Sequence, residues 1–218
     1  MRTDFDPDTV GAGGFYKLLT SVIVPRPIAW VVTRSADGVD NLAPHSFFTV
    51  ACTDPPIVQF TSIGEKDSLR NAEATGEFTV CLTPEPLLEH VNATATDFPP
   101  GQSEIDATGL TREPSLRVAT PRVAESPVAL ECRLEQVVRL GNSAVVLGRV
   151  LHAAIDESVL VDGRPDVRRL APLARLGGNE WSTLGEVLAT PRIRYADWPG
   201  HFSGESTSPS SSAASSST

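Results

Sequence analysis

Short runs of apolar and β-branched residues recur along this chain, separated by turn-forming residues. Their length and composition are typical of β-strands, which are expected at Ile28–Thr33, Leu42–Ala51, Ile57–Ile63, Phe78–Leu82, Val128–Leu140 and Ala144–Ile155. Ser35–Gly38 separates the first two runs and Gly141–Ser143 the last two, which predicts two β-hairpins. Shorter strands are expected near Val159–Leu160 and Leu170–Leu176.

Helical spacing of apolar residues is rarer. It predicts helices at Gly13–Ser21, at Ser68–Thr75 with Gly76 as the C-terminal stop, and at Glu85–Asn92. Strands do not alternate regularly with long helices, so a doubly wound sheet is not expected. The pattern predicts a mainly β fold, a small antiparallel barrel with peripheral helices. The proline-rich segment 94–127 lacks periodicity, and loops of that length are usually lids, arms or subunit contacts.

Composition adds limits on function and location. The chain has 218 residues and a formal net charge of −9, without a basic stripe, so nucleic acid and anionic membranes are not expected partners. Cys52, Cys81 and Cys132 form no CxxC pair and are expected to be free, buried thiols in a reducing compartment. No signal-peptide pattern or long apolar run is visible, which predicts a cytoplasmic protein outside the membrane. We expect a lead segment at 1–12, one domain at 13–200 and a disordered, serine-rich tail at 201–218.

Three other kinds of site are not supported by the sequence. Gly11–Gly14 follows no strand, and Tyr16 stands where the third glycine of a dinucleotide-binding turn belongs. The four histidines are scattered, so no metal site is predicted. Ser46 lies beside His45 but outside a GxSxG elbow, which argues against a hydrolase.

A flavin mononucleotide (FMN) site agrees better with the polar residues. A phosphate needs a cation, hydroxyl groups and backbone amides, ideally at the start of a helix. The segment Lys66–Asn71 offers these at the start of the predicted helix, with Asp67 or Ser68 as its capping residue. A plain capped surface helix would look the same.

The flavin ring needs backbone groups along its polar edge and apolar walls. Asn41–Ser46 is rich in small residues, and Pro44 makes this strand irregular. Trp30, Phe47, Phe48 and Trp181 are candidate walls, although each aromatic taken alone is more often a core residue.

The motifs RPIAWVVT, NLAPHSFF, DPP, KDSLRN and NATATDFPPG follow one another in an order that resembles the flavin reductase-like family, over roughly residues 15–195. The resemblance implies an antiparallel, Greek-key-like split barrel that binds FMN, and a homodimer with FMN near the subunit interface. It also implies hydride transfer from NADH or NADPH to flavin. Some members pass reduced flavin to a monooxygenase, some reduce ferric complexes, and others resemble flavoredoxin.

The resemblance also assigns roles to individual residues. Thr33 and Asn41 would lie beside the cofactor, and Ala43, Pro44, His45, Ser46 and Phe47 would border the isoalloxazine, mostly through backbone. Lys66, Ser68 and Asn71 would hold the phosphate, with Arg26 as a second cation. His152 would lie on the nicotinamide side, although it could equally be an ordinary histidine at a strand end. Trp181 stands where relatives often carry tyrosine.

Two other functions stay open from the sequence. The protein could be an FMN-bound oxidoreductase that acts on an organic substrate, or a flavoredoxin-like electron carrier that is not an enzyme. The sequence does not distinguish NADH from NADPH.

Overall fold

The structure is a computed structural model, and it describes residues 1–99 and 101–198. One compact unit spans Met1–Gly185, and a second unit begins at Glu186. Within the second unit the described part contains a single-turn helix, η3 (Tyr195–Asp197). The predicted serine-rich tail, 201–218, lies outside the described residues.

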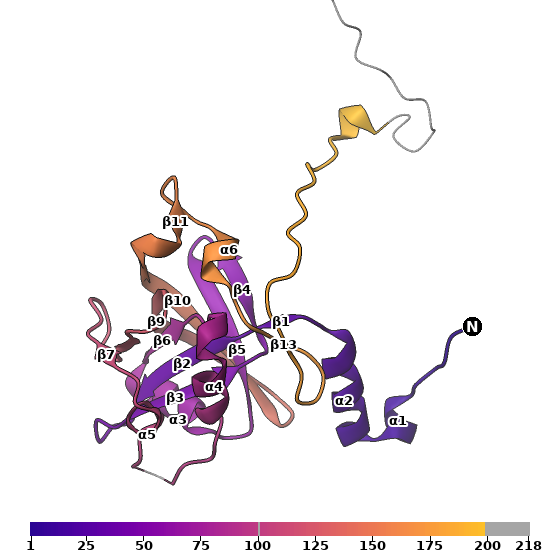
Figure 1. The fold of residues 1–218 in the computed structure, drawn as a ribbon. Helices are drawn as coiled ribbons and strands as arrows, with labels where there is room; N and C mark the ends of the chain where they lie inside the picture. The colour runs from indigo at the N-terminus through magenta and orange to yellow at the C-terminus, as the bar shows by residue number, and fades with distance from the viewer. Residues whose placement is uncertain (100, 199–218) are drawn as a thin grey trace, which may run out of the picture. The chain divides into compact units, whose positions relative to one another are not determined.

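A seven-stranded antiparallel sheet forms the body of the compact unit (Figure 1). Its order is β3-β2-β6-β9-β10-β5-β4. The strands are β2 (Ala29–Arg34), β3 (Asp40–His45), β4 (Phe48–Thr53), β5 (Pro56–Ile63), β6 (Glu77–Cys81), β9 (Val128–Leu140) and β10 (Ser143–Ile155). The two predicted hairpins, β2–β3 and β9–β10, are confirmed. The mainly β, antiparallel fold class is confirmed as well, and the fold is a split barrel.

The predicted single strand at Leu42–Ala51 was wrong. The chain leaves β3 after His45 and begins β4 at Phe48, and these two strands are the opposite edges of the sheet. Ser46 and Phe47 connect the two edges, and the carbonyl of Phe47 accepts the amide of Thr61 on β5 at 2.9 Å. Apolar patterning does not reveal such a change of partners, because both halves of the run are strand.

Two clusters of buried side chains lie on either side of β2. Trp30 and Val32 belong to the first cluster, whereas Ala29 and Val31 belong to the second. Successive side chains of a strand point to opposite faces. Burial on both faces therefore explains why this strand is apolar throughout rather than alternating. Phe60 meets Phe78 edge to face in the second cluster, at 5.4 Å between ring centroids.

Helices cover the sheet unevenly (Figure 1). The helices are α1 (Pro7–Val10), α2 (Ala12–Val22), α3 (Asp67–Thr75), α4 (Leu88–Ala93), α5 (Glu104–Thr108) and α6 (Val167–Leu170), with single turns at η1 (Glu85–Leu87) and η2 (Glu157–Val159). The helices α4 and α5 contact β3, and α3 contacts β2. Among the described residues no helix is both long and apolar enough to cross a membrane.

Small elements complete the unit. They are the strand pairs β7 (Arg112–Glu113) with β8 (Arg122–Val123) and β11 (Leu160–Val161) with β12 (Arg164–Pro165), and the three-stranded sheet of β1 (Arg26–Pro27), β13 (Ala174–Arg175) and β14 (Trp181–Ser182). The segment 94–127 therefore contains α5, β7 and β8. The buried carboxylate of Glu131 on β9 accepts the amides of Leu116 and Arg117 and the guanidinium of Arg122, which fixes this segment to the sheet.

Candidate functional site

A cavity of about 300 Å³ opens between the end of β3, the start of α3 and the first residues of the 94–127 segment. It is lined by Tyr16, Asn41, Ala43, Pro44, His45, Ser46, Phe47, Thr61, Ile63, Lys66, Asp67, Ser68, Thr94, Ala95, Thr96, Asp97, Phe98 and Glu104. The volume lies at the small end of the range for ligand pockets, about 300–1,000 Å³.

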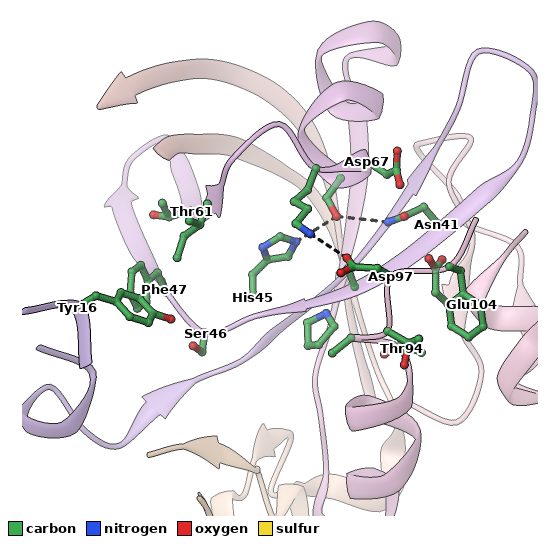
Figure 2. A pocket seen from close by; sticks show the side chains of 18 residues that line it. Tyr16, Asn41, His45, Ser46, Phe47, Thr61, Asp67, Thr94, Asp97 and Glu104 are labelled. Atoms are coloured by element: carbon green, nitrogen blue, oxygen red, sulfur yellow. Dashed lines mark hydrogen bonds and ion pairs between the residues drawn. The ribbon is translucent and has the colours of Figure 1, made fainter. Parts of the chain in front are cut away.

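The two ends of the cavity differ in chemistry (Figure 2). Tyr16 of α2 and Phe47 lie together at one end, with 6.4 Å between their ring centroids. Asp67, Asp97 and Glu104 lie at the other end, where Lys66 pairs with Asp97. One end therefore suits a flat apolar ring, whereas the other end holds a lysine among carboxylates.

His45 lies between the two ends (Figure 2). Its ring rests on Phe60 at 4.7 Å between centroids, and its Nε2 lies 3.1 Å from the hydroxyl of Ser68. Burial lowers the pKa of His45 to about 4, and a backbone hydrogen bond with Thr61 offsets this only in part. The imidazole is therefore neutral at neutral pH.

The start of α3 has no side-chain cap. The predicted cap at Asp67 or Ser68 was wrong, because the N-cap residue is Lys66. Asp67 forms an ion pair with Arg70 instead. The Ser68 hydroxyl is hydrogen-bonded to His45, and it accepts a hydrogen bond from the side-chain amide of Asn41 at 3.3 Å. First-turn backbone amides without a side-chain partner are suitable donors to an anion. The predicted stop at Gly76 is confirmed by its left-handed conformation.

Lys66 is already paired in this structure. Its Nζ lies 2.8 Å from Oδ1 of Asp97, and the hydrogen bond from Lys66 lowers the pKa of Asp97. Both side chains are exposed, to 58% for Lys66 and 88% for Asp97. The lysine is therefore the cation at this end of the cavity, and a nearby carboxylate occupies it.

The open edge of β3 supplies backbone groups to the cavity. The amide of Leu42 points away from β2, because it donates to Oε2 of Glu104 at 2.8 Å. Backbone direction alternates along an antiparallel edge strand, so the carbonyl of Pro44 also points outward, whereas the backbone of Ala43 pairs with Val31 on β2. Ala43 thus contributes its methyl group to the cavity rather than its amide.

Glu104 lines the cavity from α5. It is buried at the start of α5, and burial raises its pKa although the Leu42 amide lowers it. An acceptor for this edge amide is required, because an unpaired buried backbone group costs about 1–3 kcal/mol. The contact joins the 94–127 segment to the strand that forms the cavity wall.

Eight of the predicted cofactor residues line this cavity. They are Asn41, Ala43, Pro44, His45, Ser46, Phe47, Lys66 and Ser68. Thr33 and Asn71 do not line it: both are buried, and the Asn71 amide donates to the Thr33 hydroxyl at 3.2 Å. Their bond joins α3 to β2 and so positions the helix that carries Ser68.

Arg26 lies beside the cavity rather than in it. Its guanidinium donates to the carbonyls of Thr20 and Leu176, at 2.5 and 2.9 Å, and to the hydroxyl of Ser46 at 3.3 Å. It lies 6.0 Å from the centroid of the Phe47 ring. Arg26 also lines a second, mostly apolar cavity of about 360 Å³, which shares Ser46 and Phe47 with the first. Its role in this structure is to fix Ser46 and Phe47.

Trp181 and His152 lie away from the lining. Trp181 of β14 packs against the first core cluster, with the guanidinium of Arg175 4.4 Å from its ring centroid. His152 lies on β10 opposite Glu131, next to an irregularity in the pairing with β9. The structure therefore does not bring them together with the cavity residues.

The sequence reasoning missed Tyr16, Thr61, Ile63, Asp67 as a cavity residue, Glu104 and the Thr94–Phe98 segment. A signal for the last of these existed, because 94–127 was expected to have a functional role. Nothing in its pattern indicated which residues face the cavity.

The family model described as "Flavin reductase like domain" matches residues 21–171. The chain belongs to the flavin reductase-like family. It is 37% identical to an uncharacterized protein of Halalkalibacterium halodurans, over 86% of this chain and 95% of that protein.

Two solved structures are also similar. Nitrilotriacetate monooxygenase component B from Bacillus cereus superposes with a TM-score of 0.84 at 33% identity, covering 87% of this chain and 99% of that one. The 2-nitrobenzoate 2-nitroreductase NbaA of Pseudomonas fluorescens superposes with a TM-score of 0.81 at 26% identity, covering 88% and 98%.

The residues present fit a flavin. The cavity offers an aromatic end, an open strand edge with carbonyl and amide groups, and an uncapped helix start beside a lysine. These are the donors and walls that a ring with a polar edge and an anionic tail requires.

Proposed function

We propose that this protein binds FMN in the cavity and transfers hydride from NADH or NADPH to it, and that it supplies reduced flavin to a partner such as a monooxygenase. The observation that carries the proposal is the arrangement of Phe47, the β3 edge and Lys66 around one cavity. Membership of the flavin reductase-like family supports it. The name of the similar Bacillus cereus protein, a monooxygenase component, supports the partner.

In this proposal each part of the cavity has one task. Tyr16 and Phe47 contact the ring, and the outward carbonyl of Pro44 and the amide of Ser46 bind its polar edge. Lys66, with the first-turn amides of α3, binds the phosphate. Neutral His45 supports the middle of the ligand without adding charge.

Flavin supplies the hydride acceptor, its N5 atom, so the protein needs no general acid of its own. The chain contributes binding, orientation and exclusion of water around the reacting rings. His152 remains a proposed contact on the nicotinamide side. The free state of Cys52, Cys81 and Cys132 agrees with a reducing compartment, and we propose that the protein works in the cytoplasm.

The first test is the absorbance spectrum of the purified protein with added FMN, followed by NADH and NADPH oxidation in air. We expect binding of the flavin and consumption of at least one nicotinamide that depends on added FMN. If neither nicotinamide is consumed with excess flavin, the reductase assignment fails. Reduction of bound flavin only by a donor protein would identify an electron carrier instead.

A second candidate is an oxidoreductase that keeps its FMN and reduces an organic substrate. The similarity to a 2-nitrobenzoate 2-nitroreductase favours it. Tightly held FMN, no stimulation by free flavin, and nicotinamide consumption that requires a nitroaromatic compound would select this function over flavin supply.

We further propose that the protein is a homodimer. Helix α2 has an apolar sequence, yet its only buried residue is Thr20. Leu19, Val22 and Ile23 are exposed to 44%, 64% and 59%, and exposed apolar patches of this kind mark association sites. A second copy is the occupant, because Tyr16 of the same helix already reaches the cavity, so that a dimer would enclose the ligand.

A further inference from the structure

The charged end of the cavity does not favour a phosphate as strongly as a lysine at a helix start suggests. Lys66 lines the cavity together with three carboxylates, those of Asp67, Asp97 and Glu104. Asp67 is partly compensated by Arg70. Asp97 is different, because its partner is Lys66, the group assigned to the phosphate.

Asp97 is also placed so that it can leave Lys66 at little cost. The ion pair is largely solvated, since Lys66 is 58% and Asp97 88% exposed, and exposed pairs contribute little to stability. Three residues earlier the backbone is fixed: Thr94 is buried, and its hydroxyl accepts the indole N–H of Trp30 at 2.8 Å. The carboxylate of Asp97 can therefore move while the base of its segment stays in place.

We infer that Asp97 competes with the phosphate of FMN for Lys66 and so keeps the flavin exchangeable. The inference rests on the proposed function, because it requires flavin in this cavity. A protein that supplies reduced flavin to a partner must release it, and a built-in competitor for the phosphate contact weakens binding without altering the ring site. Asp97 is thus a specificity-determining residue, which lowers the preference for FMN over riboflavin.

The direction of the effect follows from charge. FMN must separate Lys66 from Asp97 and then carries two negative charges close to that carboxylate. Riboflavin has no phosphate and can bind with the Lys66–Asp97 pair intact. Removing the charge of Asp97 should therefore tighten FMN and leave riboflavin unchanged.

The test is a fluorescence titration of the full chain with FMN and with riboflavin, at low and high salt. Asp97→Asn removes the charge and keeps the size of an exposed side chain, so the fold should be unaffected. We expect it to tighten FMN about two- to fivefold at low salt, less at high salt, and to change riboflavin affinity by less than about twofold. Glu89→Gln is the matched control, because Glu89 is exposed on α4 and outside the cavity lining; it should change neither affinity.

Two results would overturn the inference and leave the proposed function standing. One is wild-type protein that binds FMN while Asp97→Asn leaves that affinity unchanged or weaker. The other is an equal gain for riboflavin, which would mean that Asp97 acts on the ring site. If neither flavin binds to the wild-type protein, the proposed function falls and the inference falls with it.

Discussion

The two edges of the seven-stranded sheet have opposite surroundings. At the β3 edge, Glu104 of α5 binds the outward amide of Leu42, α4 and α5 contact the strand, and Pro44 lines the cavity. At the β4 edge, Thr49, Val50 and Ala51 are exposed, with Val50 at 67%. An unprotected edge invites pairing or association. The chain therefore covers the edge that lines its cavity, whereas the other edge and the nearby apolar face of α2 are uncovered.

The largest expected effect tests the uncovered side. Leu19→Asp places a charge in the proposed dimer contact and should raise the dimer dissociation constant by about a thousandfold or more, because an unpaired charge would be buried there. Light scattering should show a dimer for the wild type and a monomer for the variant, with unchanged circular dichroism.

Leu188→Asp is the matched control, since Leu188 is 79% exposed and lies outside the compact unit. It should remain dimeric. A monomeric wild type, or a dimeric Leu19→Asp variant, would contradict the assignment of α2 to the interface.

On the covered side, His45 should make the free energy of unfolding depend on pH. The folded-state pKa of His45, about 4, is below the ordinary value of 6.5, so its contribution is present above pH 6.5 and is lost as pH falls through 4. His45→Gln should remove up to roughly 3 kcal/mol of the acid-induced loss in the free energy of unfolding. Urea unfolding between pH 7 and pH 4 measures this, and parallel curves for the two proteins would refute it.

The smallest effect concerns the single lysine of the site. Lys66→Ala should weaken FMN binding by about 1–3 kcal/mol through loss of a charge-assisted contact. Riboflavin affinity should stay constant, as should FMN affinity in the control Arg168→Ala, an exposed arginine on α6. Unchanged FMN binding in a fluorescence titration would move the phosphate site elsewhere.

Much of the fold was predictable, because each hairpin consists of two apolar runs that are separated by turn-forming residues. Gly141 and Asn142 end one long apolar run and begin another, and the structure pairs those runs as β9 and β10. The break at Ser46–Phe47 was not predictable, since it depends on which distant strands each half joins. Local pattern carries no information on that choice.

The candidate site shows the same division. Asn41, Lys66 and Ser68 lie in short motifs whose chemistry is readable, and all three line the cavity. Asp97 and Glu104 come from a proline-rich segment without periodicity, so only the folded chain reveals that they face Lys66 and Leu42. Conversely, Thr33 and Asn71 have side chains that could bind a ligand, but they form a hydrogen bond with each other.

The guanidinium of Arg26 connects helix α2, the proposed dimer contact, with the lining of the cavity. It joins the last turn of α2, through the carbonyl of Thr20, to the hydroxyl of Ser46 at the cavity rim. In the proposed dimer, a shift of that helix would therefore be transmitted to Ser46, which is proposed to border the ring. Quaternary state and flavin affinity should accordingly vary together as protein concentration is lowered.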